Sequence, residues 1–279
     1  MRFGAHVRRG AEATRGVVKE CRDRGANCAQ IFVSNPRAWA GPTIGDDQAT
    51  AFREAWRASG LGPLAAHAPY LVNIASPKPA FLERSRQLAS ATALACDRMG
   101  VDLLVLHSGA GGTDGDRDDA RRRAAETLRR TAGDAEGVRV LVELMAGTSG
   151  AVASTIPEAA ALLDAAGDDR VGLCLDTCHL FAAGYSLDTT EGVDDLFAEL
   201  AMHGLTERVG LVHANDSKFP RGERRDRHAD IGEGHIGIDG WSAILARTEV
   251  ADWTFVLETP GDAERHATDI ARLRALASA

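Results

Sequence analysis

Eight short apolar runs recur along the chain, and segments with helical spacing lie between them. The runs are RFGAHV (2–7), AQIFV (29–33), GPLAAH (62–67), VDLLVLH (101–107), VRVLVE (138–143), VGLCLD (171–176), RVGLVH (208–213) and WTFVLE (253–258). Near-continuous apolar runs of this kind are typical of parallel strands that are buried on both faces. Helical spacing over 81–100, 118–133 and 156–168 predicts three of the intervening helices. This repeated alternation predicts an α/β fold, a (β/α)8 TIM barrel, with an open doubly wound sheet as the alternative.

The size and composition fit one barrel domain over residues 1–279. A chain of this length with 44% hydrophobic residues can bury a large core. The sequence shows no linker, low-complexity tract or internal repeat that would divide it.

The five cysteines lie at irregular spacing, and no C-x-x-C is present. This pattern argues against a disulfide framework and favours a reducing compartment. The N-terminus MRFGAHVRRG has no apolar signal-peptide core, and no apolar run approaches the length needed to span a membrane. We therefore expect a cytoplasmic protein without a membrane partner.

Residues of the types that bind metals stand at the ends of six consecutive predicted strands. They are His67, His107, Glu143, Asp176, His213 and Glu258. A polar residue at the end of a single strand usually only meets solvent. In a barrel, however, the carboxyl ends of all strands converge on one face, where active sites are built. Six such residues in a row therefore predict a shared metal site.

Three further candidates flank this set. His179 follows Asp176 by three residues, and Asp226 and His228 form a D-x-H pair in a Gly-rich loop. The nine side chains offer nitrogen and oxygen ligands, which suit zinc, manganese or iron, and nine ligands are too many for one ion. We therefore expect a cluster of two or three ions. The neighbouring thiols of Cys174 and Cys178 are expected to pack, with Cys174 facing the barrel interior.

Other motifs in the sequence give weaker evidence about function. His6, His203 and His266 have no partner pattern and are expected to be structural or surface residues. The segment 232–237 has the form G-x-G-x-x-G, but it neither follows a strand nor opens a βαβ unit. We therefore expect no nucleotide cofactor. The formal net charge of −8 does not exclude a phosphate substrate, because bound divalent ions would make the pocket locally positive.

Several blocks of the chain resemble the endonuclease IV family of apurinic/apyrimidinic (AP) endonucleases. They are GAHV, HAPYLVNIASP, LCLDTCHLFAAGY, VHANDSK, DRHADIGEGHIG and LETP, in the order and spacing of the family. The resemblance implies a TIM barrel with three zinc ions, and Mn²⁺ could replace one of them. By analogy, His67, His107 and Glu143 hold the first ion. Glu143 bridges to a second ion, which Asp176, His213 and Glu258 complete, while His179, Asp226 and His228 hold the third.

The resemblance also implies a reaction and a partner. The partner is duplex DNA with an abasic site, and a metal-bridging hydroxide attacks the phosphorus 5′ to that site. Glu143 and Glu258 are the implied catalytic residues, and the products are a 3′-hydroxyl and a 5′-deoxyribose phosphate. Arg37, Tyr70 and Leu71 match residues that the family wedges into the DNA stack. Arg225 and Arg227, in the basic stretch 218–227, are expected to contact the DNA backbone. We expect the protein to act as a monomer.

Two segments depart from the family pattern, and two other functions remain open. SGAGG follows His107 where the family usually has Pro-Gly, and LMAG follows Glu143 where it usually has Asn-Thr-Ala-Gly. Both changes touch positions that orient ligands, which puts efficiency in doubt. The alternatives are a metal-dependent sugar isomerase or epimerase on a related barrel, and a lesion-binding protein without catalysis. An isomerase would need only one or two ions and gives no reason for His179, Asp226 and His228.

Overall fold

The computed structural model describes residues 1–8, 14–112 and 116–279, and within these ranges eight parallel strands close into a barrel. In barrel order the strands are β1 (Arg2–His6), β10 (Thr254–Leu257), β7 (Val209–His213), β6 (Val171–Asp176), β5 (Arg139–Glu143), β4 (Leu103–His107), β3 (Leu64–His67) and β2 (Cys28–Ile31). Because β1 pairs with both β10 and β2, the sheet has no free edge. The predicted TIM barrel is confirmed, and the open sheet is excluded.

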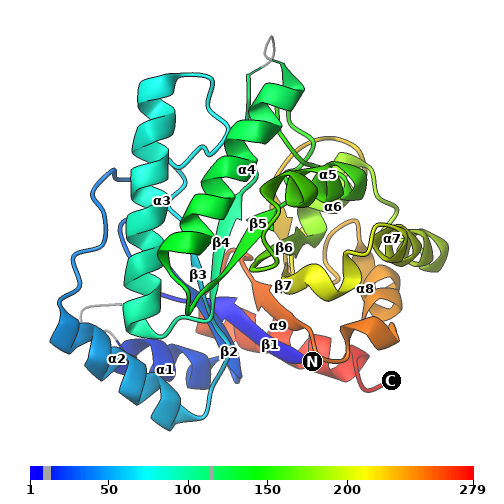
Figure 1. Cartoon of the computed structure of the whole chain (residues 1–279). Coiled ribbons are helices and arrows are strands. Elements are labelled where there is room, and N and C mark those ends of the chain that lie inside the picture. Colours follow the sequence, from blue (N-terminus) through cyan, green and yellow to red (C-terminus); the bar gives the residue numbers. More distant parts are fainter. Residues whose placement is uncertain (9–13, 113–115) are drawn as a thin grey trace.

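Helices surround the barrel, as Figure 1 shows. They are α1 (Thr14–Asp23), α2 (Asp46–Ser59), α3 (Pro79–Met99), α4 (Arg117–Asp134), α5 (Ile156–Ala166), α6 (Thr177–Ala183), α7 (Thr190–Met202), α8 (Gly237–Leu245) and α9 (Ala263–Leu276), with 3-10 turns at Thr206–Arg208 and Thr248–Val250. The predictions for α3 and α5 extended too far at the C-terminal end. Gly100 and Gly167 end these helices in the left-handed conformation, with φ of 71° and 61°.

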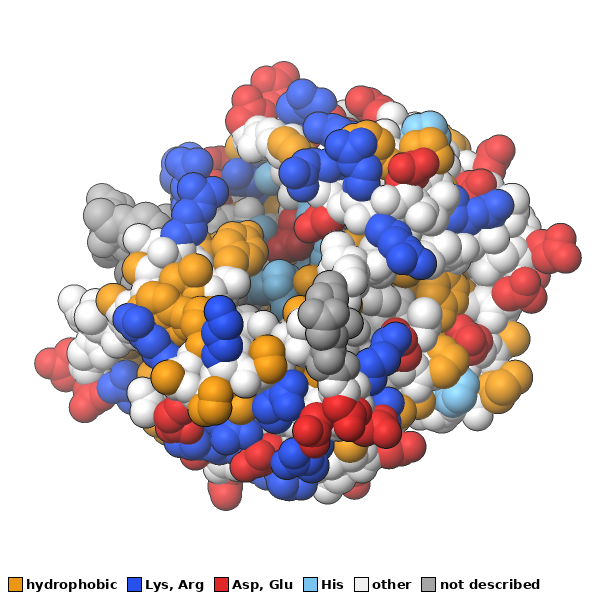
Figure 2. Space-filling view, turned by 90° about the horizontal axis from the view of Figure 1, so that it is seen from above, with side chains coloured by type: hydrophobic (Ala, Val, Ile, Leu, Met, Phe, Trp, Pro, Cys, Tyr) orange, Lys and Arg blue, Asp and Glu red, His pale blue; other side chains and the backbone are white. Residues whose placement is uncertain are grey.

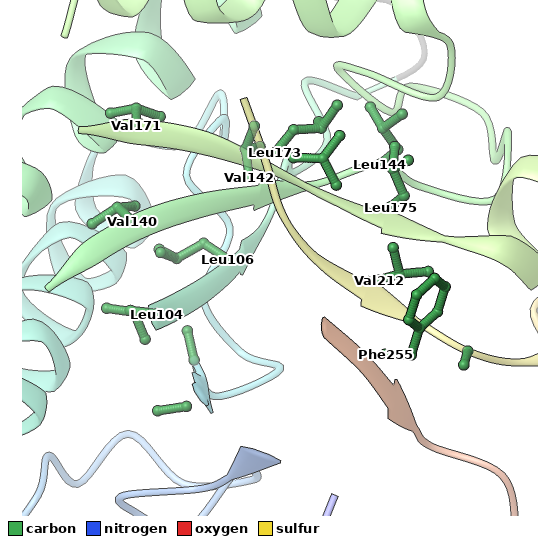
Figure 3. Packing of buried hydrophobic residues seen from close by; sticks show 14 of the residues in the cluster. Leu104, Leu106, Val140, Val142, Leu144, Val171, Leu173, Leu175, Val212 and Phe255 are labelled. Atoms are coloured by element: carbon green, nitrogen blue, oxygen red, sulfur yellow. The ribbon is translucent and has the colours of Figure 1, made fainter. Parts of the chain in front are cut away.

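Side chains on each strand alternate between the barrel interior and the surrounding helices. Outward residues such as Leu104, Val140, Leu173 and Phe255 belong to the large core beneath the helices (Figure 3). A separate buried cluster fills the barrel interior and consists of Cys28, Ala65, Leu103, Val105, Leu141, Cys174, Leu211 and Val256. Cys174 therefore faces the interior, as predicted.

The same alternation places a polar layer directly above this interior cluster. Residues two positions apart on a strand share a face, so the residue two positions after each apolar interior residue also points inward. On β4, for example, Val105 is followed by His107, and on β6, Cys174 is followed by Asp176. The candidate ligands at the strand ends therefore converge on the barrel axis at its C-terminal face.

A short hairpin lies over this face. After β7, β8 (Asp216–Ser217) pairs antiparallel with β9 (His228–Ala229). The buried Asp216 carboxylate accepts hydrogen bonds from the backbone N–H groups of Gly232 (2.9 Å) and Ile236 (2.9 Å), which fixes the Gly-rich segment after β9. The hairpin thus holds Asp226 and His228 beside the strand ends. Among the described residues, no helix has both the length and the apolar character to cross a membrane.

Candidate metal centre

The structure brings all nine candidate ligands into three groups, within each of which the ligand atoms lie within 4.8 Å of one another. The groups are His67, His107 and Glu143; Glu143, Asp176, His213 and Glu258; and His179, Asp226 and His228. Figure 2 shows the hollow on this face, with histidine and acidic side chains inside it and basic side chains around its margin. Glu143 belongs to two groups, so it joins them.

Backbone carbonyl groups orient three of the histidines. The Nδ1 atom of His67 lies 2.7 Å from the carbonyl oxygen of Ala68, and that of His179 lies 2.8 Å from the carbonyl oxygen of Leu144. The Nδ1 atom of His228 is 3.2 Å from the carbonyl oxygen of Glu258. A carbonyl only accepts, so each Nδ1 carries the proton and donates it. Each Nε2 lone pair is thereby left available for a metal ion.

The contact between His179 and Leu144 shows whether the altered segment LMAG, which begins at Leu144, weakens the support of His179. Leu144 occupies the position at which the family usually has Asn, and its side chain is buried in the core beneath the helices. His179 is supported by the carbonyl group of Leu144 and not by its side chain. The departure therefore leaves this support of His179 in place.

The other altered segment, SGAGG after His107, is also held by hydrogen bonds to the rest of the fold. The Ser108 hydroxyl donates to the carbonyl of Ala153 (3.0 Å) and accepts from the Ala153 N–H (3.2 Å). Ser108 thus joins the loop after β4 to the loop after β5.

Three buried imidazole nitrogen atoms find no hydrogen-bond partner among the described residues: Nε2 of His6, Nδ1 of His213 and Nε2 of His228, of which the last two belong to candidate ligands. The Nδ1 of His213 lies 3.2 Å from Glu143 Oε1 and 3.3 Å from Glu258 Oε2. A buried polar atom without a partner costs free energy, and a cation between nitrogen and carboxylate would satisfy both. The donor set and these unpaired atoms fit divalent metal ions.

The electrostatics of the cluster favour positive charge among the carboxylates. Burial by itself raises the pKa of Glu143, but His213 and His107 bring this pKa well below its usual range. Burial by itself lowers the pKa of His179, but Asp176 and the hydrogen bond to Asp226 bring it well above its usual range. His107 behaves differently, because burial lowers its pKa to about 4. The four carboxylates thus favour bound protons or cations beside them.

Three polar residues at the site were missed by the sequence analysis. The amide of Asn215 donates to Asp176 Oδ2 (2.7 Å) and accepts from the N–H of Glu258 (2.9 Å). Gln30 donates to Glu258 Oε1 (2.7 Å), and His6 Nδ1 lies 3.4 Å from the same oxygen. His6 was expected to be a structural or surface residue, and the structure places it in contact with the candidate ligand Glu258. The sequence could have indicated this contact, because His6 ends strand β1 just as the candidate ligands end their own strands.

The expectation for His203 and His266 agrees with the structure. His203 is exposed at the end of α7. His266 is buried between Arg24, whose Nε is 3.1 Å from His266 Nδ1, and the carbonyl of Thr259, 2.9 Å from Nε2.

The candidate DNA-wedging residues lie on two loops at the margin of the hollow. Arg37 is exposed in the loop between β2 and α2, and Leu71 is half-buried in the loop after β3. Tyr70 is 53% exposed, and its ring centroid is 5.8 Å from that of His67. The N–H of Tyr70 donates to the carbonyl of Pro36 (3.0 Å), which joins the two loops.

The basic stretch lies in the β8–β9 loop. Arg225 and Arg227 are both exposed there, and the Arg225 guanidinium stacks on Phe219 with its carbon 3.7 Å from the ring centroid. Both side chains are accessible to a polyanion.

All five cysteines lie within the described ranges and are buried and unpaired. The Cys178 thiol lies beside the candidate ligands, since its sulfur is within 4.8 Å of ligand atoms of Asp176 and His228. Burial raises the pKa of the Cys178 thiol to about 12, and the thiol donates to the carbonyl of Arg227 (3.7 Å). A protonated thiol is a poor metal ligand, which agrees with the expectation that Cys178 packs.

Comparison with known proteins places this geometry in a family. Residues 18–276 match the family described as "Xylose isomerase-like TIM barrel". A "Probable endonuclease 4" of Haloarcula marismortui is 37% identical over 263 residues, covering 93% of this chain and 92% of that protein. The structure of endonuclease IV from Thermus thermophilus aligns with a TM-score of 0.88 at 32% identity, over 100% of this chain and 99% of that one. A D-tagatose 3-epimerase-like protein (TM-score 0.74, 17% identity, 100% of this chain and 98% of that one) shares the fold alone. The chain belongs to the endonuclease IV family.

Proposed function

We propose that this protein is a zinc-dependent DNA-repair endonuclease that incises duplex DNA 5′ to abasic sites and leaves a 3′-hydroxyl and a 5′-deoxyribose phosphate. The observation that carries the proposal is the position of Glu143. Its Oε2 atom lies 3.1 Å from His67 Nε2, while its Oε1 atom lies 3.2 Å from His213 Nδ1. One carboxylate therefore serves two adjacent groups, as a multinuclear centre requires.

The residues assigned to the ions follow the three groups. His67, His107 and Glu143 would hold the first ion; Glu143, Asp176, His213 and Glu258 the second; and His179, Asp226 and His228 the third. When bound, the ions would supply a nucleophile from water near neutral pH and neutralise charge on the phosphate. We propose zinc at all three sites, with Mn²⁺ as an alternative at one.

Glu258 would act on the attacking water through its carboxylate. Burial by itself raises the pKa of Glu258, but the charge of His213 brings it well below its usual range, so the group is ionised at neutral pH. An ionised carboxylate only accepts hydrogen bonds. Gln30 donates to Oε1, so Oε2, which faces His213 Nδ1, would both contact the second ion and orient the water.

The rim residues would open the DNA. An enzyme that acts at a nucleotide inside a duplex must extrude it, and planar or apolar side chains fill the gap. Tyr70, Leu71 and Arg37 stand at the margin of the hollow with this chemistry. Arg225 and Arg227 would contact the phosphate backbone.

The test is the position of the cut. The purified protein is incubated with a duplex that carries one tetrahydrofuran abasic analogue, and the products are mapped at both ends. We expect a single cut directly 5′ to the analogue, with a 3′-hydroxyl, and no cut in a matched duplex without it. The proposal fails if the metal-replete protein cuts 3′ to the lesion or leaves the duplex intact.

A further inference from the structure

Gln30 extends the polar layer of the barrel to β2, a strand that carries none of the nine candidate ligands. It lies two residues after the interior residue Cys28, and it is fully buried. We propose that Gln30 is a positioning residue that fixes two ligands of the second group, His213 and Glu258, for metal binding. The inference rests on the proposed metal centre.

The orientation of the Gln30 amide follows from its contact with Glu258. The amide nitrogen lies 2.7 Å from Glu258 Oε1, and an ionised carboxylate can only accept a hydrogen bond. The NH₂ group must therefore face Glu258. The amide oxygen consequently faces the other way.

This orientation decides which nitrogen of His213 carries a proton. The amide oxygen of Gln30 lies 2.9 Å from His213 Nε2. An oxygen acceptor requires an N–H at this distance, so Nε2 is protonated and donates. Nδ1 is then the ligand atom, and it is the atom that faces Glu143 and Glu258. Gln30 thus gives His213 the support that backbone carbonyls give to His67, His179 and His228.

The second N–H of the amide is also engaged. The amide nitrogen lies 3.0 Å from Nδ1 of His6, whose ring packs against Phe32 with centroids 4.4 Å apart. Both donors and the acceptor of Gln30 therefore have partners. Turning the amide by 180° would place its oxygen against Glu258 and disrupt these contacts, so the network holds one arrangement.

The test uses the full-length protein, a Gln30→Met variant and Co²⁺ alone as the probe. Met has a similar length but forms neither strong hydrogen bond, so it keeps the packing and removes the support. We expect the variant to bind one Co²⁺ equivalent about 10- to 100-fold more weakly, with an altered visible absorption spectrum, because lost support of ligands weakens metal affinity to this extent. We also expect the kcat of incision to fall while KM stays near that of the parent.

Two control variants separate the loss of ligand positioning from the effects that any Gln→Met substitution or any loss of stability has on Co²⁺ binding. Gln87→Met changes an exposed glutamine on α3 and should leave Co²⁺ binding unchanged. Leu128→Ala removes buried side-chain volume from α4, remote from the ligands, and reports what lower stability alone does to Co²⁺ affinity. Gln30→Met should weaken binding well beyond Leu128→Ala.

Two results would overturn the inference. If the parent binds Co²⁺ and Gln30→Met binds it with the same affinity and spectrum, Gln30 does not position the ligands, and the proposed function stands. If the parent binds no Co²⁺, the metal centre fails, and the role of Gln30 fails with it.

Discussion

Glu143 and Glu258 belong to the same group of ligands but are held differently. Glu143 is 1% exposed and is surrounded by imidazole groups, whereas the Glu258 side chain is 16% exposed and is anchored at one oxygen by Gln30. The more accessible carboxylate is the better placed to meet water. Glu143 is correspondingly suited to joining two ions.

This difference predicts the effect of Glu258→Gln. The substitution keeps the shape of the side chain but removes the charge that would receive a proton, so we expect incision to fall by at least about 1,000-fold. Binding of abasic DNA should change by only a few fold. Single-turnover incision and fluorescence anisotropy measure the two effects, with the exposed Glu264→Gln as the control. Near-normal turnover would contradict the role of Glu258.

Asp269 on α9 predicts a pH dependence of stability that is remote from the ligands. Its side chain is buried, one oxygen lacks a hydrogen-bond partner among the described residues, and burial raises its pKa to about 6. A hydrogen bond from the Ile231 backbone and the charge of Arg272 oppose this rise, while Asp230 and Glu233 add to it. Since the folded pKa lies above the unfolded value, ionisation of Asp269 destabilises the fold as pH rises from about 4 to about 6.

We therefore expect Asp269→Asn to gain stability relative to the parent over this pH range. The difference in the free energy of unfolding should change by about 1–3 kcal/mol between pH 4 and pH 7. Urea unfolding at several pH values measures it, with the exposed Asp252→Asn as the control. A difference that is independent of pH would show that Asp269 does not titrate as described.

At the residue scale, the sequence singled out the candidate ligands, which the structure brings together, but not the residues that contact and orient them. His67, Glu143 and Asp176 were found because each ends an apolar strand, and strand ends converge in a barrel. Gln30 and Asn215 are amides, which are not typical ligands of zinc, so their residue type gave no signal. Their importance lies in contacts across the barrel, and sequence spacing does not show such contacts.

At the element scale, the hydrophobic pattern located every barrel strand but misplaced several ends. The run 29–33, for example, corresponds to β2 at Cys28–Ile31. Apolar character continues after the hydrogen-bonded pairing stops, because loop residues such as Val33 are also buried. The β8–β9 hairpin was not predicted, since strands of two residues are too short to show periodicity.

The two loops at the margin of the hollow, which carry Arg37 and Tyr70, lie outside the ligand groups. We therefore predict that a substitution there affects DNA binding without affecting metal binding. Tyr70 contacts the imidazole rings from outside and joins its loop to Pro36, but it is not a member of any ligand group. We expect Tyr70→Ala to weaken binding of an abasic duplex by about 10-fold, since loss of base–aromatic stacking costs about 1–3 kcal/mol. Metal content by elemental analysis should stay unchanged.

The matched control for this experiment is Phe81→Ala, which removes an exposed aromatic ring from α3. A Tyr70→Ala variant that binds the abasic duplex as tightly as the parent would contradict the wedge assignment.

At the scale of the whole molecule, the candidate ligands come from strands around the barrel, from α6, from the loop before β9 and from β9 itself. Removing metal should therefore destabilise the entire fold, because four carboxylates would lose their cations and binding energy is linked to folding. We expect chelation with EDTA to lower the Tm by at least about 5 °C, and Zn²⁺ to restore it.

Scanning calorimetry measures the change, and Mg²⁺ serves as the control because the histidine-rich donor set suits zinc better than magnesium. Elemental analysis before chelation should find about three zinc ions per chain. A Tm that is the same with and without bound zinc would contradict this coupling.

The carbonyl groups that orient His67, His179 and His228 have an evolutionary consequence. Every residue has a backbone carbonyl. The residues at positions 68 and 144 can therefore be substituted during evolution without loss of the hydrogen bond that Ala68 and Leu144 provide here. A survey of relatives that scores only side-chain identity would count such a position as variable and overlook it. Selection at these positions acts on the path of the backbone, which the barrel itself maintains.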